Sequence, residues 1–73
     1  MLNKIFIQKN RKLAERLKTA RIESGLTQVE ACKKLKKPQS YLSKIERGER
    51  KIEAVELGDL ARVYKKSLNY FLK

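Results

Sequence analysis

The sequence predicts an all-α fold, a compact bundle of about five short helices. Three observations favour this fold class. Apolar residues recur three or four positions apart along most of the chain, as on the buried face of a helix. Residues that typically start or end helices separate these segments, among them Gly25, Thr27, Pro38 and Gly48. No strand hairpin, internal repeat or low-complexity tract is recognisable between them.

The composition limits the function. The 73 residues carry 19 Lys or Arg against 8 Asp or Glu, a net charge of +11. The chain has no histidine, and its single cysteine, Cys32, can form neither an internal disulfide nor a structural zinc site. A chain this short leaves no room for a deep substrate cavity. We therefore expect a small anion-binding module that is not an enzyme and uses no cofactor and no metal.

The apolar pattern argues against membrane insertion and export. No apolar run approaches the roughly 18 residues that span a bilayer. The apolar part of residues 1–7 is too short for a signal peptide and precedes no small-residue cleavage site. We therefore expect a cytoplasmic protein whose anionic partner is DNA, RNA or the ribosome.

Residues 1–12 are expected to form an N-terminal arm in front of a domain over residues 13–73. The apolar residues of the arm are Leu2, Ile5, Phe6 and Ile7. Their spacing fits either one helical face or the alternation of a strand, and both remain open. The arm either packs loosely on the domain or contributes to dimerisation or DNA contact.

The first helix is predicted from about Lys12 to Ser24. Leu13, Leu17 and Ala20 recur on one face of this segment. Gly25 follows, at the position where helices commonly end in a left-handed residue.

The second helix is predicted over Gln28–Leu35. Thr27 is a suitable N-cap, and Glu30, three residues on, completes a capping box. The residues expected to be buried in it are Ala31, Cys32 and Leu35. Pro38 then prevents its continuation.

The third helix is predicted from Gln39 to about Arg47, since Pro38 suits a helix start and Gly48 a helix end. Leu42 and Ile45 form its buried stripe.

Two further helices complete the bundle. The fourth is predicted from about Glu53 to Tyr64, and its expected inward residues are Ala54, Leu57, Leu60, Ala61 and Tyr64. A last short helix is predicted over Ser67–Leu72.

The second and third helices form the functional core of the sequence. Two helices of about eight residues joined by a three-residue turn are typical of a helix-turn-helix, in which the first helix braces the second. The outer face of the third helix carries hydrogen-bonding and cationic side chains, which suit base edges and phosphates in the major groove. These outward side chains are Ser40, Lys44 and Arg47, flanked by Tyr41 and Ser43, with Gln39 at the helix start.

The run Leu26-Thr27-Gln28, followed by Gln39-Ser40-Tyr41-Leu42-Ser43-Lys44-Ile45-Glu46-Arg47-Gly48, resembles the XRE/Cro-type helix-turn-helix regulators of the lambda-repressor-like fold. The resemblance extends from about Leu13 to Phe71. It implies that bases are read by Gln39, Ser40 and Lys44. It implies that the DNA backbone is contacted by Thr27, Gln28, Tyr41, Ser43, Arg47, Arg50 and Lys51. It further implies a buried salt bridge between Arg21 and Glu46.

The sequence departs from the family pattern at four positions. Cys32 replaces the usual Ala, and we interpret it as a small core residue in preference to a redox-sensing thiol. Lys36 stands at a left-handed turn position where Gly is usual, and Lys costs free energy there. Pro38 replaces a Ser or Thr cap, and Lys66 replaces a buried aliphatic residue.

The last helix holds more apolar surface than one small core needs. The residues proposed for a dimer interface are Leu68, Tyr70, Phe71 and Leu72. Simple closure of the core is the alternative.

These features predict a homodimeric, sequence-specific regulator of transcription that binds double-stranded DNA, with repressor or autoregulator as its usual role. Its operator would be nearly palindromic, with half-sites about one helical turn apart. Antitoxins, restriction–modification controllers and phage or plasmid repressors share this pattern, and a protein partner such as a toxin or antirepressor remains open. No small-molecule ligand and no membrane contact are expected. The alternatives outside this class are a general RNA- or ribosome-binding protein and a pure interaction module.

Overall fold

The computed structural model describes residues 6–7 and 11–72. Within these residues it contains five helices and two short strands, so the all-α prediction is confirmed with one small addition. The elements are β1 (Phe6–Ile7), α1 (Arg11–Glu23), α2 (Gln28–Leu35), α3 (Gln39–Glu46), β2 (Ile52–Glu53), α4 (Ala54–Tyr64) and α5 (Leu68–Leu72). In this part of the chain, no helix is long and apolar enough to cross a membrane.

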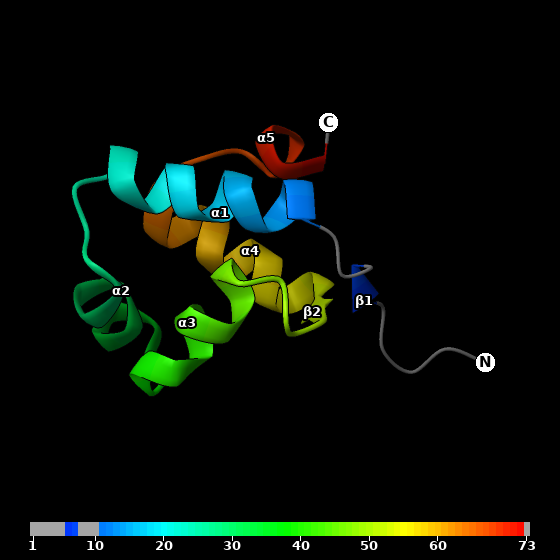
Figure 1. Cartoon of the computed structure of the whole chain (residues 1–73). Coiled ribbons are helices and arrows are strands. Elements are labelled where there is room, and N and C mark those ends of the chain that lie inside the picture. Colours follow the sequence, from blue (N-terminus) through cyan, green and yellow to red (C-terminus); the bar gives the residue numbers. More distant parts are fainter. Residues whose placement is uncertain (1–5, 8–10, 73) are drawn as a thin grey trace.

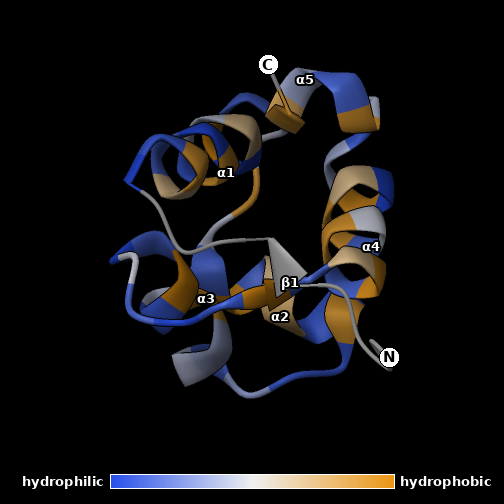
Figure 2. Cartoon of the chain, turned by 90° about the vertical axis from the view of Figure 1, so that its right-hand side faces the viewer, coloured by the Kyte–Doolittle hydropathy of each residue, from blue (hydrophilic) through white to orange (hydrophobic). Residues whose placement is uncertain are grey.

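The helices enclose a single core. α2 packs against α3 and α4, and α1 packs against α3, α4 and α5. α2 and α3 lie at one end of the molecule, whereas α5 lies at the other, across α1 and α4 (Figure 1). The hydrophobic sides of the helices face inward and their hydrophilic sides face outward (Figure 2). The helix-turn-helix therefore occupies one end of the domain, with most of α1 and α4 between it and α5.

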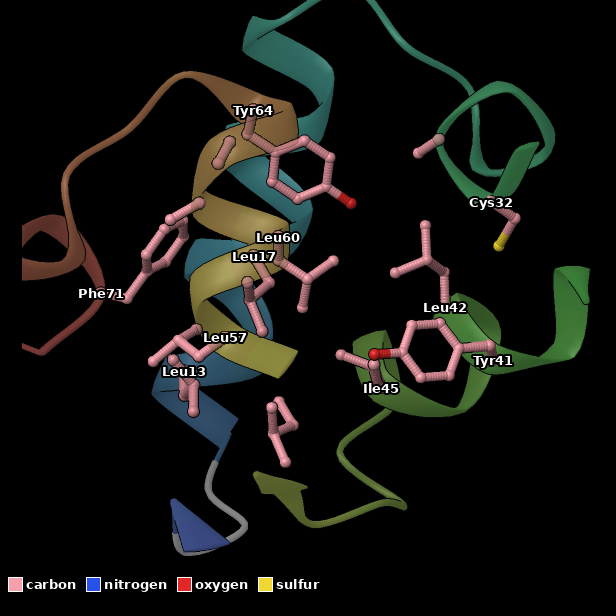
Figure 3. Packing of buried hydrophobic residues seen from close by; sticks show 14 residues of the cluster. Leu13, Leu17, Cys32, Tyr41, Leu42, Ile45, Leu57, Leu60, Tyr64 and Phe71 are labelled. Carbon is pink, nitrogen blue, oxygen red and sulfur yellow. The ribbon is translucent and has the colours of Figure 1, made fainter. Parts of the chain in front are cut away.

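The core draws on every helix. Leu17 and Leu60 are 0% exposed, as is Leu42 from α3. Figure 3 shows these side chains converging between α1, α3 and α4, with Tyr64 closing one end. The other members of the cluster are Leu13, Ala20, Ala31, Cys32, Tyr41, Ile45, Ile52, Leu57, Ala61 and Phe71. Cys32 is 2% exposed and lies in the core as a small apolar residue.

Local signals fix the limits of α2. Thr27 Oγ accepts a hydrogen bond from the Glu30 amide at 3.1 Å, and Glu30 Oε1 accepts one from the Thr27 amide at 2.9 Å. This reciprocal capping box satisfies two amides that a helix start leaves without partners. The predicted bounds of α2 and its cap are confirmed.

α2 and α4 end in left-handed lysines. Lys36 has φ 59° and Lys65 has φ 57°, in the region that residues with a Cβ avoid. At Lys36 the helix is closed by amide–carbonyl hydrogen bonds from Lys36 to Lys33 and from Lys37 to Cys32, at 3.2 and 3.0 Å. Lys36 therefore does occupy the left-handed turn that favours glycine.

The N-terminal region differs from the predicted arm. α1 begins at Arg11 and ends at Glu23, so Arg11 and Lys12 belong to the helix. β1 pairs antiparallel with β2, with Phe6 opposite Glu53 and Ile7 opposite Ile52. Residues 6–7 are thus a strand, one of the two alternatives that the spacing of the apolar residues left open. Residues 1–5 and 8–10 of the predicted arm lie outside the described residues.

Three smaller expectations about α2, α4 and α5 were wrong. Ala54 is exposed because it is the first residue of α4, outside the reach of the core. Leu35 is only half-buried at the end of α2, although it packs against the core cluster. α5 begins at Leu68, one residue later than predicted.

The strain at Lys36 gives a stability prediction. Lys36→Gly should raise the free energy of unfolding by about 0.5–1 kcal/mol, because glycine adopts a left-handed conformation without a Cβ clash. Lys34→Gly, at a right-handed position in the last turn of α2, is the matched control and should lower it by up to about 1 kcal/mol. Urea denaturation measures both. Equal losses in the two variants would contradict a strained turn.

Candidate nucleic-acid interface

α3 presents one polar face to solvent. Gln39, Ser40 and Lys44 are exposed, whereas Leu42 and Ile45 are 0% and 1% exposed on the opposite side. Lys44 forms no ion pair with any residue in the described part of the chain. The three side chains predicted to read bases are therefore available on one face of a short helix.

Tyr41 does not flank this outer face as predicted. It is 8% exposed and belongs to the core cluster. Two cations lie near its ring, with Lys37 Nζ 5.3 Å and the Arg50 guanidinium carbon 5.0 Å from the ring centre. Burial first, and then the negative charge of Glu56, raise the pKa of the Tyr41 hydroxyl above its usual value. The ring joins α3 to the loop that follows it.

A buried salt bridge orients α3. Arg21 Nε donates to Glu46 Oε2 at 2.8 Å and Arg21 Nη2 donates to Glu46 Oε1 at 3.1 Å. The Arg21 side chain is 10% exposed and the Glu46 side chain 4%. The structure thus contains the pair that the family resemblance implies, and this pair accounts for a carboxylate on the inward side of α3.

The Glu46 carboxylate also links α2 to α1 and α3. Gln28 Nε2 donates to Glu46 Oε1 at 3.0 Å, and Arg21 Nη1 donates to the Leu26 carbonyl at 2.9 Å. The hydrogen bond to Glu46 is the main cause that raises the pKa of Arg21. One network therefore joins the end of α1, the α1–α2 turn, the start of α2 and the end of α3.

The loop after α3 is held by a second ion pair. Arg50 Nη2 and Nη1 donate to Glu56 Oε2 and Oε1 at 2.9 and 3.2 Å, and Nη1 also donates to the Lys51 carbonyl at 2.9 Å. Glu56 Oε1 accepts from the Glu53 amide at 2.9 Å, which caps α4. Arg50, predicted to contact the DNA backbone, is thus tied to the fold, while Lys51 beside it is exposed.

Arg47, at the end of α3, is also paired. Its guanidinium donates to both oxygens of Glu49, at 3.0 and 3.1 Å, and to Ser43 Oγ. Arg47 and Glu49 are both exposed, and the hydrogen bond to Glu49 raises the pKa of Arg47. The two predicted backbone-contacting residues Ser43 and Arg47 therefore lie together.

Sequence reasoning missed the partners of these arginines. Glu49 and Glu56 were not identified from the sequence as the ion-pair partners of Arg47 and Arg50. Charge alternation along Arg47 to Lys51 is the signal that points to the first pair. The second pair depends on how the loop folds back onto α4, for which no sequence pattern exists.

The residues predicted to form a dimer interface separate into two groups. Leu68 and Leu72 are 46% and 56% exposed on α5. Phe71 is 3% exposed, and its ring contacts that of half-buried Tyr70 edge-on at 4.9 Å. Phe71 was wrongly assigned to the outer surface, because the turn of α5 points it at the core.

The arrangement defines a class of protein. A short polar helix, braced by a second helix and anchored through a buried ion pair, is a helix-turn-helix built to bind DNA. The sequence matches the Helix-turn-helix family over residues 17–71. The chain belongs to this family, that of the XRE-type DNA-binding regulators.

Solved structures support the same assignment. The controller protein C.AhdI of the restriction–modification system from Aeromonas hydrophila is 26% identical, with a TM-score of 0.78 over 84% of this chain and 92% of that one. A point mutant of the controller C.Esp1396I is 26% identical, with a TM-score of 0.76 over 85% and 78% of the two chains. The C.Esp1396I tetramer on its natural 35 base-pair operator is 25% identical, with a TM-score of 0.71 over 86% and 93%. No curated protein sequence matches the chain.

The buried pair gives a stability prediction. Arg21→Met should lower the free energy of unfolding by about 3–5 kcal/mol, because it leaves the Glu46 carboxylate buried without its cation. Arg62→Met removes an exposed pair with Asp59, whose side chains are 73% and 47% exposed, and should cost less than about 1 kcal/mol. Urea denaturation measures both variants.

The double variant Arg21→Met, Glu46→Leu separates the charge from the packing. It should regain most of the stability lost in Arg21→Met, because no buried charge remains. An Arg21→Met variant as stable as Arg62→Met would contradict the anchoring role of the pair.

Proposed function

We propose that this protein is a sequence-specific regulator of transcription of the restriction–modification controller type, acting as a homodimer on a nearly palindromic operator. The observation that carries the proposal is the exposed polar face of α3, held in place by the Arg21–Glu46 network. The similarity to controller proteins, one of them in complex with its operator, supports the choice within the family.

The proposed roles follow the geometry of α3. It enters the major groove, where Gln39, Ser40 and Lys44 read base edges. Thr27, Gln28, Ser43, Arg47, Arg50 and Lys51 are assigned to the DNA backbone. Tyr41, buried beneath Arg50, supports the backbone-contacting loop in place of the direct contact first assigned to it. The protein acts by occupying DNA in the cytoplasm and not by chemistry on it.

The position of α5 supports a dimer. Leu68 and Leu72 expose apolar surface at the end of the domain remote from α3 (Figure 1). Two copies joined through α5 would leave both α3 helices uncovered by the interface, so that each can enter a major groove. Tyr70 borders this surface and Phe71 supports it from within.

General RNA binding is the competing function, and aromatic burial disfavours it. RNA-binding modules stack bases on exposed rings. Tyr41, Tyr64 and Phe71 are all buried in this structure. Competition separates the two functions: a specific regulator retains its operator in the presence of excess RNA, whereas a charge-driven binder is displaced equally by RNA and by random DNA.

The base-reading role predicts a change in specificity. Sequences selected from a random duplex pool should show a symmetric site, and Lys44→Ala should lose about 1–3 kcal/mol at particular base pairs of it. Lys51→Ala is the control and should weaken all duplexes alike, with a salt dependence shallower by about one unit. Uniform losses in Lys44→Ala would count against base reading.

The dimer surface predicts a change in assembly. Leu68→Asp with Leu72→Asp should give a folded monomer that binds the selected site more weakly, because carboxylates would be buried at the interface. Val55→Asp is the control, since Val55 is 75% exposed on α4. Sedimentation equilibrium measures the oligomeric state of each variant. A dimer that persists in the double variant and dissociates in Val55→Asp would refute the assignment of α5.

A further inference from the structure

Glu49 is an acidic side chain inside the surface assigned to DNA. Its carboxylate binds the Arg47 guanidinium at two points, with Arg47 Nε and Nη2 donating at 3.0 and 3.1 Å. The third guanidinium nitrogen, Nη1, donates to Ser43 Oγ. All three guanidinium nitrogens of Arg47 therefore already donate within the protein, and the edge formed by Nε and Nη2 is occupied by the carboxylate.

The geometry of this pair is that of an arginine on DNA. A guanidinium binds a carboxylate and a phosphate with the same two parallel N–H···O hydrogen bonds. The Arg47 and Glu49 side chains are each 54% exposed, so the pair lies in water and is easily opened. Glu49 thus occupies the place that a backbone phosphate would take.

We propose that Glu49 is an intramolecular phosphate mimic, which occupies Arg47 in the free protein and is displaced when the DNA backbone binds. This rests on the proposed function, because it needs Arg47 to face DNA. The effect of Glu49 is to lower affinity for all duplexes alike, since phosphate contacts carry no sequence information.

The surroundings allow the displacement. An open cleft of about 590 Å³ borders the pair, and its lining includes Arg11, Glu15, Arg47 and Glu49. A displaced Glu49 can therefore turn into a cleft that is lined by a second arginine, Arg11, together with Glu15. The fold thus provides a route away from Arg47.

The neighbouring pair has the opposite character. The Glu56 side chain is 12% exposed, binds Arg50 and also caps α4 through the Glu53 amide. Releasing Arg50 would leave the largely buried Glu56 carboxylate without its cation, so Arg50 keeps this pair while it lies beside the DNA backbone. Of these two arginines, Arg47 is the one that exchanges its carboxylate for a phosphate.

Glu49→Gln tests the proposal against a matched control, Asp59→Asn. Both changes add one positive unit and open an exposed arginine–carboxylate pair, but the Asp59–Arg62 pair lies on α4, outside the candidate interface. Binding of a random-sequence duplex is measured by fluorescence anisotropy from about 50 to 200 mM salt. Glu49→Gln should bind about two- to fivefold tighter at low salt, with a salt dependence steeper by about one unit. Asp59→Asn should bind like the unmodified protein.

The same change in an Arg47→Ala background isolates the mechanism. There, Glu49→Gln should give a clearly smaller gain, because no guanidinium remains to be released and only the repulsion between the carboxylate and the phosphates is removed. A gain of the same size without Arg47, or a gain equal to that of Asp59→Asn, would overturn the proposal.

The proposal of a sequence-specific regulator fails independently of the Glu49 proposal if selection from random duplexes yields no preferred site. The Glu49 comparison on random DNA still stands in that case, since it needs duplex binding and no specificity. If the unmodified protein binds no duplex at all, both proposals fail.

Discussion

The arrangement of this domain depends on one buried ion pair, between Arg21 of α1 and Glu46 of α3. An eight-residue helix has little stability of its own, so the direction of α3 must come from what it packs against. Apolar packing through Leu42 and Ile45 holds α3 to the core. The two parallel hydrogen bonds of the ion pair add a directional constraint on α3, and Gln28 extends this constraint to the helix that braces it. The buried carboxylate thus orients the surface that we propose reads DNA.

Part of the net charge of +11 is not directly available to bind DNA, because several basic side chains are paired with carboxylates of the protein. Residues 1–37 carry eleven basic and three acidic side chains, against eight and five in residues 38–73. Near α3, Arg47 and Arg50 are occupied by carboxylates, whereas Lys44 and Lys51 form no ion pair with any residue that the structure describes. The cations at the candidate interface therefore divide into two lysines without an ion pair to a described residue and two arginines that are paired with carboxylates of the protein.

The sequence pattern predicted most of the fold, but it did not predict which side chains of the candidate site are buried or paired. The capping box at Thr27 and the helix stop at Pro38 are local signals, so α2 and the start of α3 followed from them. Tyr41 and Phe71 were predicted to lie on the surface, Tyr41 toward DNA and Phe71 at a dimer interface. An aromatic residue beside the buried stripe of a short helix can lie either in the core or on the surface. Their burial depends on the loop above Tyr41 and on the turn before α5. The pairing of β1 with β2 and of Arg50 with Glu56 depends on distant segments meeting, which residue spacing does not specify.

The outer face of α3, anchored by Arg21 and Glu46, is the surface that we propose contacts duplex DNA. The most direct test is an NMR titration of ¹⁵N-labelled protein with a duplex. The largest amide shift changes are expected at the start of α2, along α3 and in the loop to Lys51, with α5 little affected by the duplex itself. Changes confined to α4 and α5, with α3 unaffected at saturation, would contradict this assignment.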